Sequence, residues 1–133
     1  MSEPAVTIRF DRNGQVYLPG ETLRGEYLLE HFAAGELRAV EVSVLWYSEG
    51  KGDEDLQVHE FWRSSLENCR PQDLGRPEPF STTLPESPLS YDGALMRLHW
   101  CVRVRAFLQR GKEIVAQKVF RLGNVPAAGS DLA

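Results

Sequence analysis

The side chains that could carry out chemistry are few in this chain of 133 residues, and they lie far apart in the sequence. A nucleophilic serine or cysteine needs a base within hydrogen-bond reach and a third group that orients the base. The histidines His31, His59 and His99 stand in no motif that would assemble such a set. The sequence also lacks a Gly-x-Ser-x-Gly elbow and a phosphate-binding glycine loop. We therefore expect no enzymatic activity and no cofactor.

The one spacing compatible with a metal site is His99-x-Cys101, because side chains two residues apart share a face of a strand. Zinc would have to take its other ligands from His59 and Cys69, which belong to distant segments. The simpler interpretation is an exposed histidine beside a small thiol that is buried or half-buried. We favour this second interpretation and expect no metal.

Charge is divided unevenly along the chain, whose total is −4. Residues 1–92 hold 8 Lys or Arg against 17 Asp or Glu, a net charge of −9, while residues 93–133 hold 7 against 2, a net charge of +5. Acidic strand faces could simply pair with basic faces across the sheet, or the basic residues could form a face that binds an acidic partner. The candidate interaction face consists of Arg97, His99, Arg103, Arg105, Lys118 and Arg121.

Most of these basic side chains belong to a run from Leu95 to Leu108 in which apolar and polar residues alternate. A period of two is typical of a half-buried β-strand, with the arginines on one face and the apolar residues on the other. The apolar positions are Met96, Leu98, Trp100, Val102, Val104, Ala106 and Leu108. Because the run is longer than most strands, we expect a bulge or bend near Cys101 or Phe107.

The rest of the chain also reads as a series of strands separated by turns. The expected strands are Val6–Phe10, Gln15–Leu18, Leu23–Phe32, Leu37–Ser48, Leu56–Arg63, Phe80–Leu84 and Glu113–Leu122. Pro19-Gly20 suits the centre of a type II turn, and Gln109–Lys112 suits a hairpin. Gly25 inside its strand marks a bulge or a close packing contact. Many short strands at such spacing predict one domain with an all-β sandwich fold.

The segment from Ser64 to Pro79 is polar and is expected to cross the surface. One helical turn at Ser65–Cys69 is an alternative for part of this segment. Aromatic side chains precede it on two predicted strands, namely Trp46, Tyr47, Phe61 and Trp62. If those strands alternate, these side chains cannot all face inward. The exposed ones could bind a sugar or a peptide, or they could pack under this segment, which is the interpretation we favour.

Two motifs resemble those of arrestin-type domains. The first is Tyr17-Leu18-Pro19-Gly20-Glu21 followed by Leu23 and Gly25, and the second is Leu84-Pro85 with Pro88, Ser90, Tyr91 and Gly93 before the long strand. The resemblance implies an immunoglobulin-like antiparallel β-sandwich, which we assign to residues 1–122. The small, polar and unpatterned residues 123–133 are expected to form a flexible tail. Members of this group are mostly non-enzymatic adaptors and scaffolds. They usually carry two such sandwiches in tandem, whereas this chain has the length of one, so receptor regulation is not implied.

The expected function is therefore a protein-protein interaction module with an unknown partner, and the alternative is a sandwich that binds a small ligand or carbohydrate. Binding would use an exposed sheet edge that accepts an extended segment, or the basic face meeting an acidic segment. The same edges could instead form a homodimer. The net negative charge argues against nucleic acid, and no apolar run is long enough for membrane insertion. Without a recognisable signal peptide, the two cysteines are expected to be free thiols in the cytoplasm.

Overall fold

The computed structural model describes residues 3–13, 15–33, 35–50, 52, 54–66 and 75–123. Every regular element in these residues is a strand: β1 (Ala5–Phe10), β2 (Val16–Tyr17), β3 (Thr22–Glu30), β4 (Leu37–Gly50), β5 (Leu56–Ser65), β6 (Glu78–Thr83), β7 (Tyr91–Asp92), β8 (Met96–Leu108) and β9 (Glu113–Leu122). The seven shorter predicted strands and the long one are confirmed to within a few residues, and β7 is an addition. Gly123, the first residue of the predicted tail, is described and donates a hydrogen bond to Tyr17 O. The rest of that tail and most of the Ser65–Cys69 turn lie outside the described residues.

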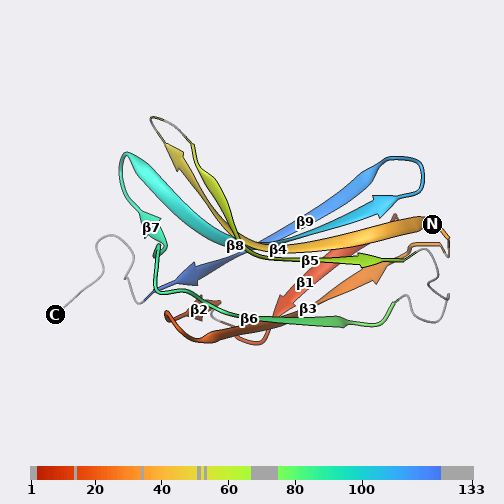
Figure 1. Cartoon of the computed structure of the whole chain (residues 1–133), viewed down its shortest axis with the longest axis horizontal. Helices are drawn as coiled ribbons and strands as arrows, with labels where there is room; N and C mark the ends of the chain where they lie inside the picture. Colours follow the sequence, from red (N-terminus) through yellow and green to blue (C-terminus); the bar gives the residue numbers. More distant parts are fainter. Residues whose placement is uncertain are drawn as a thin grey trace.

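The strands form two sheets that pack face to face (Figure 1). The smaller sheet has the order β1-β3-β6, and the larger has the order β2-β9-β8-β4-β5, with β7 added beside β8. All neighbours are antiparallel except β2 and β9, which run parallel. The fold is thus the predicted all-β sandwich. Among the described residues, no helix could cross a membrane.

Strand β8 lies at the centre of the larger sheet and supplies the middle of the core. Its side chains at Trp100, Val102, Val104 and Ala106 are at most 1% exposed. They pack against the inner face of the smaller sheet, where Leu23, Tyr27 and Phe80 are buried. The predicted alternation is confirmed except at Met96, which is exposed because it begins the strand where the sheet curves away from the core.

The expected bulge on the long strand lies elsewhere. Strand β8 keeps a continuous register with β9 through Cys101. Against β4 the register shifts next to Phe107, and the extra residue is Arg38 of β4 rather than a residue of β8. A second shift leaves His59 of β5 without a partner on β4. Bulges increase the local twist of a sheet, and both ends of the larger sheet bend away from the smaller one (Figure 1).

The turn of the first sequence motif is formed as predicted. Gly20 has a φ of +83°, and the amide of Glu21 donates to the carbonyl of Leu18 at 3.0 Å. This is the geometry that places proline first and glycine second in a type II turn. The turn is also bonded to Leu84 at the start of the second motif, since Gly20 N donates to Leu84 O and Leu84 N donates to Glu21 O. The two motifs therefore meet in space.

The proline-rich second motif is a fixed crossing from the smaller sheet to the larger one. The indole nitrogen of Trp100 donates to the carbonyl of Pro88 at 2.7 Å. Ser90 accepts from and donates to the backbone of Leu122 on β9, at 2.8 and 2.9 Å. These bonds tie the crossing to two strands of the larger sheet, so it forms a corner between the sheets.

Gly25 marks a close packing contact and no bulge, because β3 keeps its register with both β1 and β6 at this position. A Cβ atom here would lie 2.5 Å from the carbonyl oxygen of Arg9 and 2.6 Å from Cζ of Phe80. Neither neighbour can move without disturbing a strand or the core. Only glycine therefore allows the smaller sheet to close over Phe80.

We expect Gly25→Ala to lower the free energy of unfolding by about 1–3 kcal/mol, the usual cost of an overpacked core. Urea denaturation followed by circular dichroism measures this change. The neighbouring exposed side chain provides the control, because Arg24→Ala should change stability by no more than about 0.5 kcal/mol. Equal midpoints for the two variants would show that the contact is not tight.

Cys101 points away from the core and is nevertheless fully buried. It lies on the curved outer face, opposite Leu45 of β4, which is buried, and Val119 of β9, which is partly exposed. Burial raises the pKa of its thiol to about 11. The predicted buried free thiol is confirmed.

In a Cys69→Ser variant we expect the remaining thiol to react with a disulfide reagent at pH 8 roughly 100-fold more slowly in the folded than in the unfolded protein, because the thiolate is scarce and shielded. Absorbance of the released thiol gives both rates. Rapid reaction of the folded protein would contradict the burial of Cys101.

Candidate functional site

Five of the six residues predicted to form an interaction face lie on the outer face of the larger sheet. Arg97, His99, Arg103 and Arg105 alternate with the core residues of β8, and Arg121 lies beside His99 on β9. A hollow of about 550 Å³ is lined in part by Arg97, His99 and Arg121, together with Tyr91. The structure therefore brings half of the predicted set into one place.

Lys118 is the exception, and the prediction that it shares this face is wrong. It stands opposite Val102 in the register of β8 and β9, so it points to the side of the core. Its ammonium group lies 5.5 Å from the centre of the Phe10 ring on β1. There it covers the aromatic contact between Phe10 and Phe120 at the margin of the sandwich.

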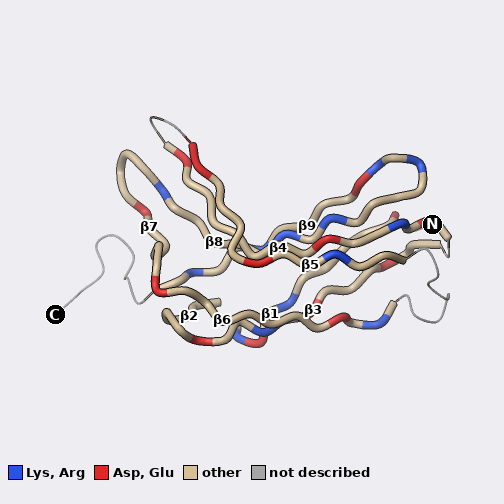
Figure 2. The backbone as a smooth tube through the Cα atoms, viewed as in Figure 1, with Lys and Arg blue, Asp and Glu red and all other residues tan. Residues whose placement is uncertain are grey.

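The basic side chains of the outer face are largely matched by acids or amides on neighbouring strands. Arg97 pairs with Asp92 at 3.2 Å and His99 with Glu49 at 2.7 Å. Arg105 pairs with Glu113 at 2.7 Å, and Arg103 donates to the amide oxygen of Gln117. Positive and negative residues consequently lie side by side on adjacent strands (Figure 2). The outer face is a mosaic of paired charges and not a continuous basic surface.

Apolar side chains flank these pairs on the same face. On β5, Val58 and Phe61 are each 50% exposed, and Leu56 is equally open. On β9, Val115 and Val119 are 48% and 46% exposed. Because both ends of the larger sheet bend away from the smaller one, this outer face is concave (Figure 1). The sequence contained a sign of the exposed valines on β9. Apolar residues occur at both odd and even positions of that strand, so some of them must lie on the outer face.

Three guanidinium groups gather around Phe107 at one end of the outer face. The groups of Arg38, Arg63 and Arg105 lie 6.0, 5.5 and 5.1 Å from the ring centre. Arg63 and Arg105 also reach the carboxylate of Glu41. This cluster around Phe107 combines residues of β4, β5 and β8, and it lies close to the end of β5.

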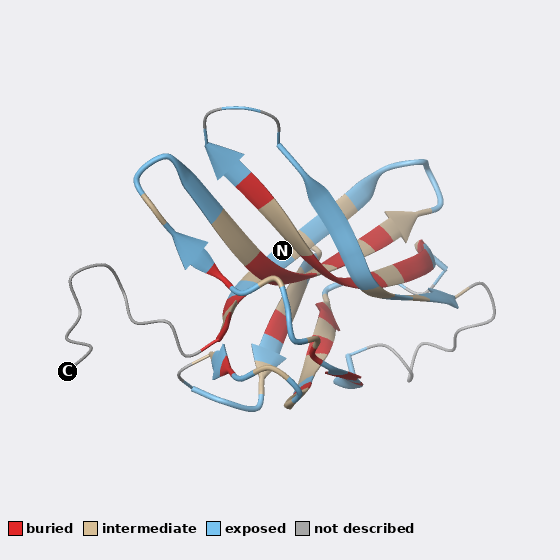
Figure 3. Ribbon diagram, turned by 60° about the vertical axis from the view of Figure 1, so that its left-hand side comes forward, coloured by how far each residue is buried: buried red, intermediate tan, exposed pale blue. Residues whose placement is uncertain are grey.

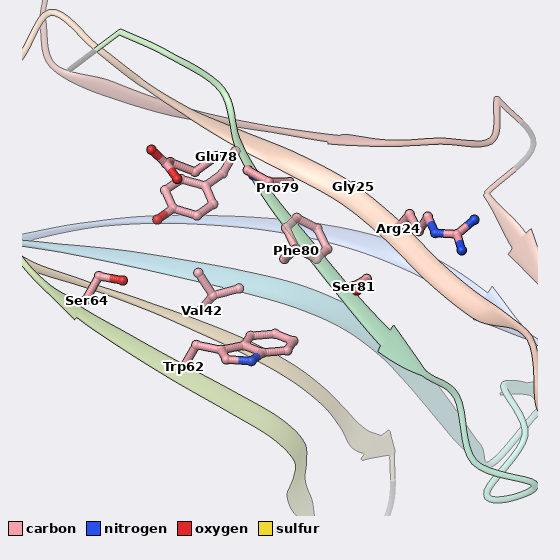
Figure 4. A pocket seen from close by; sticks show the side chains of 10 residues that line it. Arg24, Gly25, Val42, Trp62, Ser64, Glu78, Pro79, Phe80 and Ser81 are labelled. Carbon is pink, nitrogen blue, oxygen red and sulfur yellow. The ribbon is translucent and has the colours of Figure 1, made fainter. Parts of the chain in front are cut away.

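A second hollow of about 550 Å³ opens between the edge strands β5 and β6 of the two sheets. Inward-facing side chains line it, among them Tyr27, Val42, Trp62, Ser64, Glu78 and Phe80. Trp62 and Phe80 project into the space between the two strands, and Ser64 and Glu78 lie at its wider end (Figure 4). We call this hollow the β5–β6 opening.

The narrow end of the β5–β6 opening is closed by contacts of the β5 bulge. His59 contacts the carbonyl of Thr83 at 2.8 Å through its Nε2 atom, and Glu60 accepts a hydrogen bond from the hydroxyl of Thr82. These contacts join the two sheets at one point along their edges. In the opening itself, burial and the nearby Glu78 raise the pKa of Tyr27 to about 12, so its phenol stays protonated.

The four aromatic residues singled out from the sequence are divided between the two faces. Phe61 and Tyr47 lie on the outer face, whereas Trp62 lines the β5–β6 opening and Trp46 packs against the core. The prediction that not all of them face inward is confirmed. We also expected the segment after Ser64 to cover some of these side chains. Residues 67–74 of that segment lie outside the described part of the chain.

The side chains considered for zinc are not brought together. His99 lies on the outer face, His59 is turned to the inner side of β5, and Cys101 is fully buried. Cys69 lies outside the described residues. Within the described ranges, no three His, Cys, Asp or Glu side chains are grouped so that they could hold a metal ion.

No protein-family model matches the sequence, and no curated protein matches it. Among solved structures, the chain is similar to the sporulation control protein Spo0M from Bacillus subtilis, with 14% identity and a TM-score of 0.67 over 94% of this chain and 51% of that one. It is also similar to superoxide reductase (neelaredoxin) from Ignicoccus hospitalis, with 10% identity and a TM-score of 0.54 over 89% of this chain and 80% of that one. The chain thus spans about half the length of Spo0M. At these identities the similarity concerns the fold alone, and it supports the arrestin-type sandwich implied by the two sequence motifs.

Proposed function

We propose that this chain is a non-enzymatic protein-protein interaction module, of the kind used in adaptors and scaffolds. The observation that carries the proposal is the concave outer face of the larger sheet. Its exposed apolar side chains on β5 and β9 flank a centre of paired charges. Exposed apolar side chains gathered on one face of a domain are typical of surfaces that bind other proteins.

The charged centre of this face suits recognition better than strong binding. Surface ion pairs contribute about 0–1 kcal/mol each, but their arrangement favours partners with a complementary pattern. Exposed apolar side chains such as Phe61, Val115 and Val119 would add affinity through the burial of their apolar surface. A cytoplasmic location is part of the proposal, supported by the free thiol of Cys101.

The proposal is tested by placing charge on the apolar part of the outer face. We expect the double variant Val115→Lys, Val119→Lys to lose partners captured by the wild-type protein in the cells that produce it. Losing two interface side chains at roughly 1 kcal/mol each lowers affinity by about tenfold or more. Quantitative mass spectrometry of affinity-captured material gives the enrichment of each partner.

The control is Leu95→Lys, which adds one positive charge at a residue that is 70% exposed and precedes the start of β8. Thermal melting verifies that all three proteins are folded. If the double variant and the control retain the same partners at the same enrichment, the outer face is not the binding surface.

A further inference from the structure

We infer that the β5–β6 opening binds an extended segment of a partner protein, which adds to the edge of β5 and inserts one large apolar side chain between the sheets. The inference rests on the proposed function and names its partner as an unfolded or extended stretch of chain. It concerns the edge of the sandwich, whereas the proposal above concerns the concave face.

The backbone of β5 has hydrogen-bonding groups available for such a segment. Leu66 N donates to Arg38 O at 2.9 Å, so in the antiparallel register Ser64 and Trp62 also bond to β4. The alternate residues Phe61, Arg63 and Ser65 therefore direct their N–H and C=O groups away from β4. Among the described residues, no strand pairs with that side of β5, and most of the strand is exposed (Figure 3).

The other sheet edges are less suited to accept a strand. β6 contains Pro79, which has no N–H group and follows Glu78 at the start of the strand. β2 is only two residues long. β1 lies against β9, where the rings of Phe10 and Phe120 are 5.9 Å apart. Natural sheets protect their edges in such ways, and the Phe61–Ser65 part of β5 has none of them apart from the charge of Arg63.

The opening provides a pocket for alternate side chains of the added strand. A residue opposite Trp62 would point inward, because facing residues of neighbouring strands share a face. It would meet Trp62, Phe80 and Tyr27 in a hollow of about 550 Å³, a volume in the range that holds small ligands. The residues on either side of it would point outward, next to Phe61 and Arg63. Main-chain bonds with pockets for alternate residues are the usual mode of strand addition.

Charge selects the occupant. The cluster around Phe107 contains three guanidinium groups, of Arg38, Arg63 and Arg105, against the carboxylates of Glu41 and Glu113. Glu41 pairs with Arg63 and Glu113 with Arg105, so the cluster as a whole holds one positive charge in excess, beside the place where an outward residue of the added strand would lie. We therefore assign to the partner an acidic residue next to its large apolar residue. A second copy of this chain, pairing through its own β5, would bring another Arg63 to this place. Two like charges would then meet where the cluster favours a carboxylate.

The probe is a phage-displayed library of random twelve-residue peptides, panned against the whole chain. We expect enriched peptides in which a large apolar residue stands next to Asp or Glu. The strongest binder, made with a fluorescent label, is then measured by polarisation against two variants at one position. Phe61→Pro removes the N–H that faces the free edge and should weaken binding by roughly tenfold or more. Phe61→Ala keeps this N–H and should weaken it much less.

Two further measurements keep the inference falsifiable if Phe61→Pro is poorly folded. Hydrogen exchange should show the amides of Phe61 and Arg63 fast in the free protein and protected with bound peptide, while Ser64 is protected in both. Arg63→Glu should shift the preference from acidic to basic peptides. A library without binders, binding insensitive to both substitutions, or a protein dimer dissolved by Phe61→Pro would each overturn the inference. Competition of the peptide by an oligosaccharide would also overturn it in favour of a carbohydrate site.

Failure of this inference is distinguishable from failure of the proposed function. If the Val115 and Val119 double variant loses its partners and no peptide binds at β5, the chain is an interaction module that works without strand addition. If a peptide binds at β5 and the double variant keeps its partners, the edge of β5 is the binding surface and the concave face is not.

Discussion

Burial of one face of β8 between the two sheets is the interaction on which the rest of the structure depends. Trp100, Val102 and Val104 are almost completely removed from solvent, and each such side chain contributes about 1.5–3 kcal/mol when it is fully buried. A slip of one residue would turn Arg103 and Arg105 into the core. The hydrophobic effect therefore sets the register of β8 against β4 and β9, and with it the composition of the outer face.

The two sides of the sandwich are closed differently, and this asymmetry decides where a partner has access. On one side, the rings of Phe10, Tyr17 and Phe120 contact one another edge to face. On the other side, the side-chain contacts that join β5 to β6 among the described residues lie near the bulge at His59, and a hollow lies beyond them. An open margin beside an unpaired strand is unusual for a stable domain unless something covers it. The fold thus points to the edge of β5 as well as to the concave face.

Charge on the outer face follows from the same register. The acidic residues of the first part of the chain and the basic residues of the last part meet because β4 and β8 are neighbours, as in Glu49 with His99. Pairs of this kind offset part of the charge asymmetry of the sequence in the folded protein. What remains is a local excess around Phe107, where the residues come from three strands.

The sequence by itself determined the strands, the turn at Pro19-Gly20, the sandwich class and the division of β8 into two faces, because alternation and turn chemistry are local properties of the chain. It did not decide the face of Lys118, since β9 carries apolar residues in both alternating sets. The acidic partners of Arg97 and Arg105, the burial of Cys101 on an outer face and the opening beside Trp62 were decided only by the tertiary structure. These features depend on which strands become neighbours and how the sheet curves, and contacts between distant segments control both.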